Sequence, residues 1–294
     1  MSGFSRGASI SAVLTAAALA LTVSTGPDAQ AGTADVVCTT PAVAMYHVDG
    51  LAQLRRWSFA APLDGTPGWA QQMIGTSWSG LNVMSGGNGV LYTIDQDGNL
   101  RWYSDKNYAN GGGASWDPAS GSVIGTGWNV FTTVISGGDG VFYAVDSSGN
   151  LHWYRDLAMN GTTSWAPGSG EVIGTGWTNP TTLVAGGAGI IYTVDPAGNL
   201  DWYRHLDPSG GAATWADGGI GSPIGAGWSG FTRIGSFGGG ILMARDATGT
   251  VWWYRYADPL DGTTVWANQG AGTAEGTGWS DGQLVTDVGG CVAS

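Results

Sequence analysis

Charged residues are scarce in this sequence, and most of those present are acidic. Asp, Glu, Lys and Arg make up 11% of its 294 residues, and the formal net charge at pH 7 is −12. So low a charge content, with 16 Trp and 10 Tyr, excludes the usual composition of a disordered chain. The acidic balance argues against nucleic acid as a partner, because the protein would repel a phosphate backbone.

The sequence also has few of the residues on which catalysis depends. Its only glutamates are Glu171 and Glu275, and its three histidines occupy three different positions of the repeat described below. Glycoside hydrolysis normally needs two carboxylates with separate roles around one bond. A nucleotide-binding glycine motif opens a helix, and no segment here has the apolar period of a helix. We therefore expect no enzyme and no cofactor.

Long apolar runs are absent after the first residues of the chain. Residues 1–31 have the pattern of a secretory signal, with Arg6, an apolar stretch over residues 10–24 and the cleavage site Ala29-Gln30-Ala31. No other run approaches the roughly 20 apolar residues of a membrane helix. We expect a secreted protein without a membrane span, with one mature domain over residues 32–294.

The sequence has only two cysteines, Cys38 and Cys291, close to the ends of the expected mature chain. In an exported protein such a pair usually forms a disulfide. Two free thiols or a metal site are the alternatives. Two cysteines without a nearby pair of histidines make a poor zinc site, so we expect no metal.

Glycine, in contrast, is abundant, and it follows a repeat. The 53 glycines have no G-X-Y period, which excludes collagen. A phrase like Tyr-Ala-Val-Asp-x-x-Gly-Asn-Leu-x-Trp-Tyr occurs five times, and each copy is followed by a lone Trp. Each copy then ends in a segment like Gly-Thr-Gly-Trp, and successive closing tryptophans are 50, 49, 51 and 51 residues apart. A fixed period of this size indicates an array of repeats.

The third copy shows what one repeat forms. Residues 131–136, 141–145, 151–155 and 171–173 are predicted strands, separated by a Gly-rich turn, an Asp-x-x-Gly-Asn turn and a polar loop. Four short antiparallel strands, five times over, predict an all-β fold, a five-bladed β-propeller. Packing blades in a ring buries both faces of each sheet, which explains why the strands are nearly continuous in apolar residues.

The two ends of the sequence complete each other. The first repeat lacks its innermost strand, and residues 283–288 supply a matching segment at the other end. We therefore expect the C-terminal strand to close the ring in the first blade and to bring Cys291 near Cys38. In the chain-entropy model, a disulfide closing so long a loop stabilises by about 4–5 kcal/mol.

Polar and aromatic residues of the repeat gather at one end of the predicted ring. With strands running up and down, the turn after the second strand lies at the same end as the connection to the next blade. Carboxylates and carboxamides bind sugar hydroxyls, and an indole packs against the C–H face of a sugar. The candidate carbohydrate-binding residues are Asp95, Asp146, Asp195, Asp246, Asn99, Asn150, Asn199, Trp78, Trp128, Trp177, Trp228 and Trp279. Each has a structural alternative, because an Asp or Asn can form the turn and a Trp can fill the space between blades.

The repeat resembles a known family. The run Val-Phe-Tyr-Ala-Val-Asp-x-x-Gly-Asn-Leu-x-Trp-Tyr-Arg, the following Trp165 and the segment Val-Ile-Gly-Thr-Gly-Trp are similar to the tachylectin-2 family, over essentially the whole mature chain. The resemblance implies a lectin with one site per blade, between neighbouring blades, for N-acetylglucosamine or N-acetylgalactosamine. Its partners would be glycans that carry N-acetylhexosamine. The alternative is a propeller scaffold for protein–protein interaction without sugar binding.

The first repeat departs from the pattern. Arg56 stands where the other repeats have Trp, Trp57 takes the place of Tyr, and Ala52 replaces the turn Gly. We expect the sugar site of this repeat to be weak or lost.

Overall fold

The computed structural model describes residues 34–178, 180, 182–279 and 282–294. The expected signal segment, residues 1–31, lies outside the described residues. Within them the secondary structure is strands and four short 3-10 turns, η1 (Trp128–Val130), η2 (Ala216–Gly219), η3 (Trp228–Gly230) and η4 (Ala267–Gly270). No helix of the described residues has the length and hydropathy that a membrane crossing requires.

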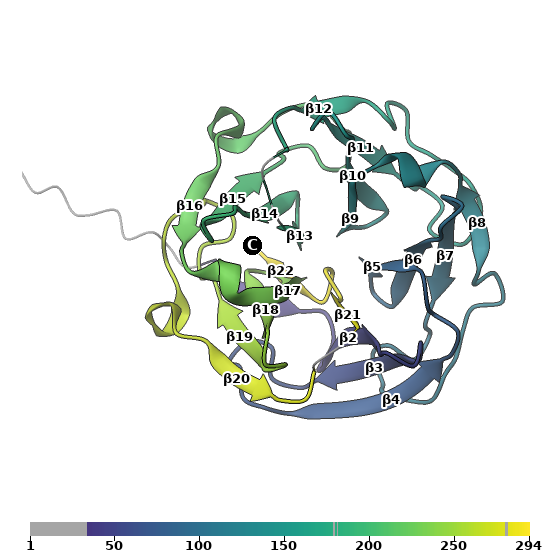
Figure 1. The fold of residues 1–294 in the computed structure, drawn as a ribbon, viewed down its shortest axis with the longest axis horizontal. Helices are drawn as coiled ribbons and strands as arrows, with labels where there is room; N and C mark the ends of the chain where they lie inside the picture. Colours follow the sequence, from purple (N-terminus) through teal and green to yellow (C-terminus); the bar gives the residue numbers. More distant parts are fainter. Residues whose placement is uncertain (1–33, 179, 181, 280–281) are drawn as a thin grey trace, which may run out of the picture. The chain divides into compact units, whose positions relative to one another are not determined.

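Five four-stranded antiparallel sheets form the blades of a propeller (Figure 1). Blade 1 consists of β21 (Gln283–Thr286), β2 (Val43–Val48), β3 (Leu54–Phe59) and β4 (Trp69–Gly75). Blade 2 consists of β5 (Asn82–Gly87), β6 (Val90–Ile94), β7 (Leu100–Ser104) and β8 (Ser122–Gly125). Blade 3 consists of β9 (Thr133–Gly138), β10 (Val141–Val145), β11 (Leu151–Arg155) and β12 (Val172–Gly174). Blade 4 consists of β13 (Thr182–Gly187), β14 (Ile190–Val194), β15 (Leu200–Arg204) and β16 (Ser222–Gly225). Blade 5 consists of β17 (Phe231–Gly238), β18 (Ile241–Asp246), β19 (Val251–Arg255) and β20 (Thr273–Gly276).

The second strand of each blade is buried between its neighbours. All five residues of β10 are buried, whereas in β11 Leu151 and Trp153 are buried and the other three residues are half-buried. The turn that leads into β10 requires glycine. Gly140 has φ +74°, and a Cβ there would collide with the backbone oxygen of Asp156. This turn therefore fixes the first hairpin of the blade against the loop that follows its third strand.

The C-terminal strand closes the ring, which confirms the prediction from the sequence. β21 pairs with β2 in antiparallel register, from Met45 opposite Thr286 to Val48 opposite Gln283. The chain ends then form a separate two-stranded sheet of β1 (Val36–Cys38) and β22 (Cys291–Ala293), which the sequence did not predict. Cys38 lies directly opposite Cys291 in this sheet, and the two form a disulfide. The free-thiol and metal alternatives for this pair are therefore excluded.

Hydrogen bonds from buried tryptophans join blades 3, 4 and 5 to the blade that follows each of them, whereas the buried indole N–H of Trp102 in blade 2 has no partner. The indole N–H of Trp153 donates to the backbone oxygen of Pro208 at 2.9 Å, and Trp202 donates to Pro259 at 2.8 Å. Trp253 of blade 5 donates to Pro62 of blade 1 at 2.9 Å. These three indoles belong to the hydrophobic core.

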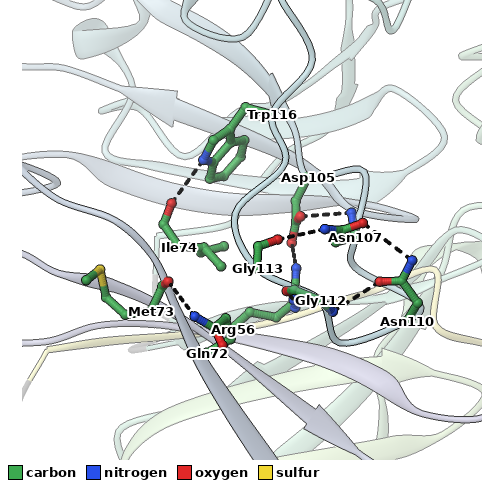
Figure 2. A network of polar contacts seen from close by, with 10 residues as sticks. All are labelled: Arg56, Gln72, Met73, Ile74, Asp105, Asn107, Asn110, Gly112, Gly113 and Trp116. Atoms are coloured by element: carbon green, nitrogen blue, oxygen red, sulfur yellow. Dashed lines mark hydrogen bonds and ion pairs between the residues drawn. The ribbon is translucent and has the colours of Figure 1, made fainter.

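Arg56 takes this role between blades 1 and 2. Its guanidinium group forms a buried ion pair with Asp105 and donates to the backbone oxygen of Gly112 (Figure 2). An ion pair therefore joins blades 1 and 2 at the seam where the third strand lacks the usual Trp.

Candidate functional site

The predicted aspartates cap their own turns. In blade 3 the Oδ1 atom of Asp146 accepts the backbone N–H groups of Ser148 at 2.8 Å and Asn150 at 2.9 Å. Asp95, Asp195 and Asp246 accept the corresponding backbone N–H four residues ahead in their blades. The turn therefore engages one oxygen of each carboxylate, and the structural role that the sequence left open is present in all four.

In blades 2, 3 and 4 the second oxygen of the turn carboxylate accepts a hydrogen bond from the predicted asparagine. The side-chain amides of Asn99, Asn150 and Asn199 donate to Oδ2 of their own turn Asp at 3.0, 2.9 and 2.8 Å. In blade 5 Thr250 replaces the Asn, and its backbone N–H, together with the Thr248 hydroxyl, binds Oδ1 of Asp246 instead. The Asp and Asn candidates thus form one polar unit per blade instead of two independent contacts.

One variable residue faces this polar unit in every blade. It occupies the second position of the third-strand motif, and in four blades it is a donor: Arg55, Arg101, His152 or Trp252, placed 2.9–3.5 Å from the turn carboxylate. Hydrogen bonds from His152 and Asn150 hold the pKa of Asp146 far below its usual range, and Thr248 and Trp252 lower the pKa of Asp246 to about 2.

Blade 4 is the exception, because Asp201 stands where the other blades have the donor. Burial and the neighbouring charge of Asp195 raise the pKa of Asp201. This position recurs in register in all five repeats of the sequence, and that regular spacing is the signal that marks it, although it was not among the candidates. The blades therefore share one backbone arrangement at this turn but differ in the charge of the side chain beside it.

The closing tryptophans lie at the seams between blades. The backbone N–H of Trp128 donates to the turn oxygen of Gly98 at 3.0 Å, which places the closing Trp at the same end as the Asp turn. Its indole contacts Tyr154 and Trp165 of the next blade, with ring centroids 4.8 and 5.8 Å apart. The same trio recurs at the other seams around Trp78, Trp177, Trp228 and Trp279, with Trp57 in place of Tyr in blade 1.

The lone Trp of each repeat completes the trio, and it was not among the candidates. Its indole N–H reaches back across the seam to the outer strand of the preceding blade. Trp116 donates to the backbone oxygen of Ile74 at 3.0 Å (Figure 2), and Trp266 donates to that of Ile224 at 2.6 Å. The regular spacing of these tryptophans was the signal, but only the fold shows that they belong to a cleft between blades.

Two of the seams open into pockets. The cleft between blades 4 and 5 holds about 300 Å³ and is lined by Trp228, Phe231, Tyr254, Trp266 and residues 224–227 and 269–270. The cleft between blades 3 and 4 holds about 170 Å³. Trp177, Tyr203 and Pro180 line its apolar side, and Asp195 and Asp201 line its polar side. Three of the predicted residues, Trp177, Trp228 and Asp195, thus line a pocket.

The chain matches the Tachylectin family model over residues 37–283. It belongs to the Tachylectin family. Membership of this lectin family indicates carbohydrate binding without catalysis, and the five-bladed ring agrees with it. No curated protein matches the chain at a significant level. Among the residues that the structure describes, no group of three or more His, Cys, Asp or Glu side chains is arranged to hold a metal ion.

Solved structures give only remote likenesses to this Tachylectin chain. A point mutant of Aleuria aurantia lectin in complex with alpha-methyl-L-fucoside is 15% identical, with a TM-score of 0.41, over 82% of this chain and 78% of that one. A triple mutant of AofleA from Arthrobotrys oligospora is 13% identical, with a TM-score of 0.41, over 87% and 74%. Prp20p from Saccharomyces cerevisiae is 11% identical, with a TM-score of 0.38 over 76% of this chain, which spans 59% of that structure's length. In a second Prp20 structure, bound to Kap60, this chain spans 56% of the length of the matched chain.

Proposed function

We propose that this protein is a secreted lectin that binds terminal N-acetylated amino sugars, N-acetylglucosamine or N-acetylgalactosamine, in the clefts between neighbouring blades. The observation that carries the proposal is the aromatic trio repeated at the seams, which opens into pockets beside blade 4. Aromatic walls with a few convergent polar groups are typical of small-ligand sites.

The chemistry of these clefts suits an acetylated sugar. The rings of Trp228, Tyr254 and Trp266 offer apolar faces to the C–H side of a pyranose and to an acetamido methyl group. Carboxylates and backbone groups at the rim supply the hydrogen bonds that hydroxyls need. We propose the closing tryptophans and the Asp-Asn units of the turns as the residues that contact the sugar. The carboxylate lone pairs that the turn does not use would accept hydrogen bonds from the sugar hydroxyls.

Weak single sites become useful when they are repeated on one rigid ring. A dissociation constant of about 1 mM corresponds to only about −4 kcal/mol. Several such sites on one molecule gain strength on a dense glycan surface, because the second contact is intramolecular. The proposed ligand is therefore a surface or polysaccharide with many terminal N-acetylhexosamine groups.

We also propose export to an oxidising compartment, with residues 1–31 as a signal and residues 32–294 as the mature lectin domain. The disulfide between Cys38 and Cys291 supports this, because such bonds persist outside the reducing cytosol.

A glycan array followed by calorimetric titration of the mature chain tests the proposal. We expect retention on chitin or mucin and elution by free N-acetylglucosamine but not by glucose. If a protein is captured from mucin and the free sugar does not compete, the protein-scaffold alternative holds instead.

A further inference from the structure

The seam between blades 5 and 1 differs from the others at one position of its wall. At the other four seams the lone Trp donates its indole N–H to the backbone oxygen of an isoleucine. At this seam Trp69 donates instead to the side-chain carboxyl of Glu275, Nε1 to Oε2, at 3.2 Å. Glu275 occupies the isoleucine position of its repeat. A carboxyl group therefore stands where the other blades have an apolar side chain.

This carboxyl group is buried and only half satisfied. Glu275 is 6% exposed, and its Oε1 atom has no hydrogen-bond partner. The indole N–H of Trp57 is buried and unpartnered as well. Trp57 and Trp69 both pack against Trp279, with ring centroids 4.4 and 6.3 Å apart. One aromatic cluster thus holds an acceptor and a donor that no protein group satisfies, and such atoms are rare in folded proteins because each costs free energy.

The residues that carry these groups are equivalent to residues that line a pocket at the neighbouring seam. Glu275, Trp279, Trp57 and Trp69 are the repeat counterparts of Ile224, Trp228, Tyr254 and Trp266. Those four line the pocket of about 300 Å³ between blades 4 and 5. The residues that carry the unpaired acceptor and donor therefore occupy the wall positions of the corresponding cleft.

We propose that the cleft between blades 5 and 1 is a ligand site with its own recognition chemistry, in which Glu275 accepts a ligand N–H and the Trp57 indole N–H donates to a ligand oxygen. A secondary amide carries both groups, and its apolar substituent fits between indole faces. This deepens the proposed function and rests on it, and it names the acetamido group as the recognised element. It replaces the expectation that the cleft of the first repeat is weak.

The charge around the carboxyl group gives the site a pH dependence. Burial raises the pKa of Glu275 to about 7, the Trp69 hydrogen bond opposes this, and Asp64 adds to it. His47 faces the cluster from the other side, with its ring 5.4 Å from that of Trp279. A ligand N–H favours ionised Glu275, so binding lowers its pKa and affinity rises with pH through neutrality. Each unit of that lowering corresponds to about tenfold in affinity.

Each seam carries its own reporter, because its lone Trp has an indole N–H that gives a separate nuclear magnetic resonance signal. We would titrate the protein with N-acetylglucosamine at about pH 5.5 and about pH 8.5, either side of the Glu275 pKa, and follow Trp69 against Trp116 and Trp266. We expect the Trp69 signal to move with the sugar, with about tenfold tighter binding at the higher pH. The other two signals should show no such pH dependence.

Two variants and one ligand complete the design. Glu275→Ile restores the residue of the other repeats and should remove the pH dependence of the Trp69 response, leaving a response like those of Trp116 and Trp266. Glu275→Gln should keep a weaker response without pH dependence. Glucose, which has no amide, should leave Trp69 unmoved. A silent Trp69 beside responding Trp116 or Trp266 overturns this inference alone, as does an unchanged pH dependence of the Trp69 response in Glu275→Ile. Silence of all three signals overturns the proposed function itself.

Discussion

Arg56 and Asp105 form an ion pair that is fully buried across the seam between blades 1 and 2 (Figure 2). The two residues come from neighbouring blades and lie 49 residues apart, about one repeat period. Removing one partner leaves an uncompensated buried charge, whereas removing both leaves an apolar seam. The pair therefore makes blade 1 dependent on blade 2 in a way that its other contacts do not.

We expect Arg56→Met to lower the free energy of unfolding by about 3–5 kcal/mol, because Asp105 loses its partner. Arg55→Met is a matched control on the same strand. Arg55 pairs with Asp49 near the surface, so its loss should cost less than about 1 kcal/mol. Chemical denaturation of both variants and of Arg56→Met/Asp105→Leu measures the difference. A double variant less stable than Arg56→Met would contradict the buried-charge account.

The disulfide between Cys38 and Cys291 closes a loop of 253 residues. Replacing both cysteines by Ser should lower the free energy of unfolding by up to about 5 kcal/mol, since the unfolded chain gains freedom. The blade pairing of β21 with β2 remains, so the variant should still fold. Denaturation of the oxidised protein, the reduced protein and the double variant checks this. Equal stability of all three would show that the C-terminal strand alone holds the ring.

Asp201 is predicted to destabilise its own blade at neutral pH. Its pKa is raised by burial and by Asp195, so the folded state prefers the protonated form. Stability from this group is present at low pH and is lost as pH rises through its folded pKa. Asp201→His, which copies His152 of blade 3, should raise the melting temperature at pH 7 and have little benefit near pH 3.

The converse change is the control for that prediction. His152→Asp recreates the like-charge pair beside Asp146 and should lower the melting temperature at pH 7, with a smaller effect in acid. If the melting curves of both variants are identical to that of the unchanged protein, solvent screens the charges of these carboxylates.

The variant Asp146→Ala distinguishes the two possible roles of the turn carboxylates, capping the turn and contacting the sugar. Asp146→Ala removes bonds to Ser148, Asn150 and His152, so we expect a lower melting temperature. If the carboxylate also contacts sugar, calorimetry should count one site fewer per chain. Lower stability with an unchanged number of sites would restrict Asp146 to capping its turn.

The fold was predictable because its information is local and repeated. β10 and β11 have the bounds that the third repeat predicted, and the closing strand pairs where the missing strand of blade 1 required it. β9 begins later than expected, at Thr133, because Phe131 caps η1 and Thr132 follows it before the strand starts. Boundaries of this kind depend on how the chain turns between blades.

The candidate site was less predictable, because a cleft is made by two blades. The sequence marked Trp128 and Trp165 as repeated but could not show that they meet across a seam. The turn aspartates could be read as caps or contacts, and hydrogen-bond geometry was needed to find them capping. Glu275 was visible as one of two glutamates, yet its burial against Trp69 depends on ring closure.

The proposed lectin function requires that the seams between blades bind acetylated amino sugars. Calorimetric titration of the mature chain, residues 32–294, with N-acetylglucosamine and with glucose tests it most directly. We expect about millimolar binding of the acetylated sugar at more than one site per chain, with no heat from glucose. Absence of binding to N-acetylglucosamine and N-acetylgalactosamine alike would contradict it.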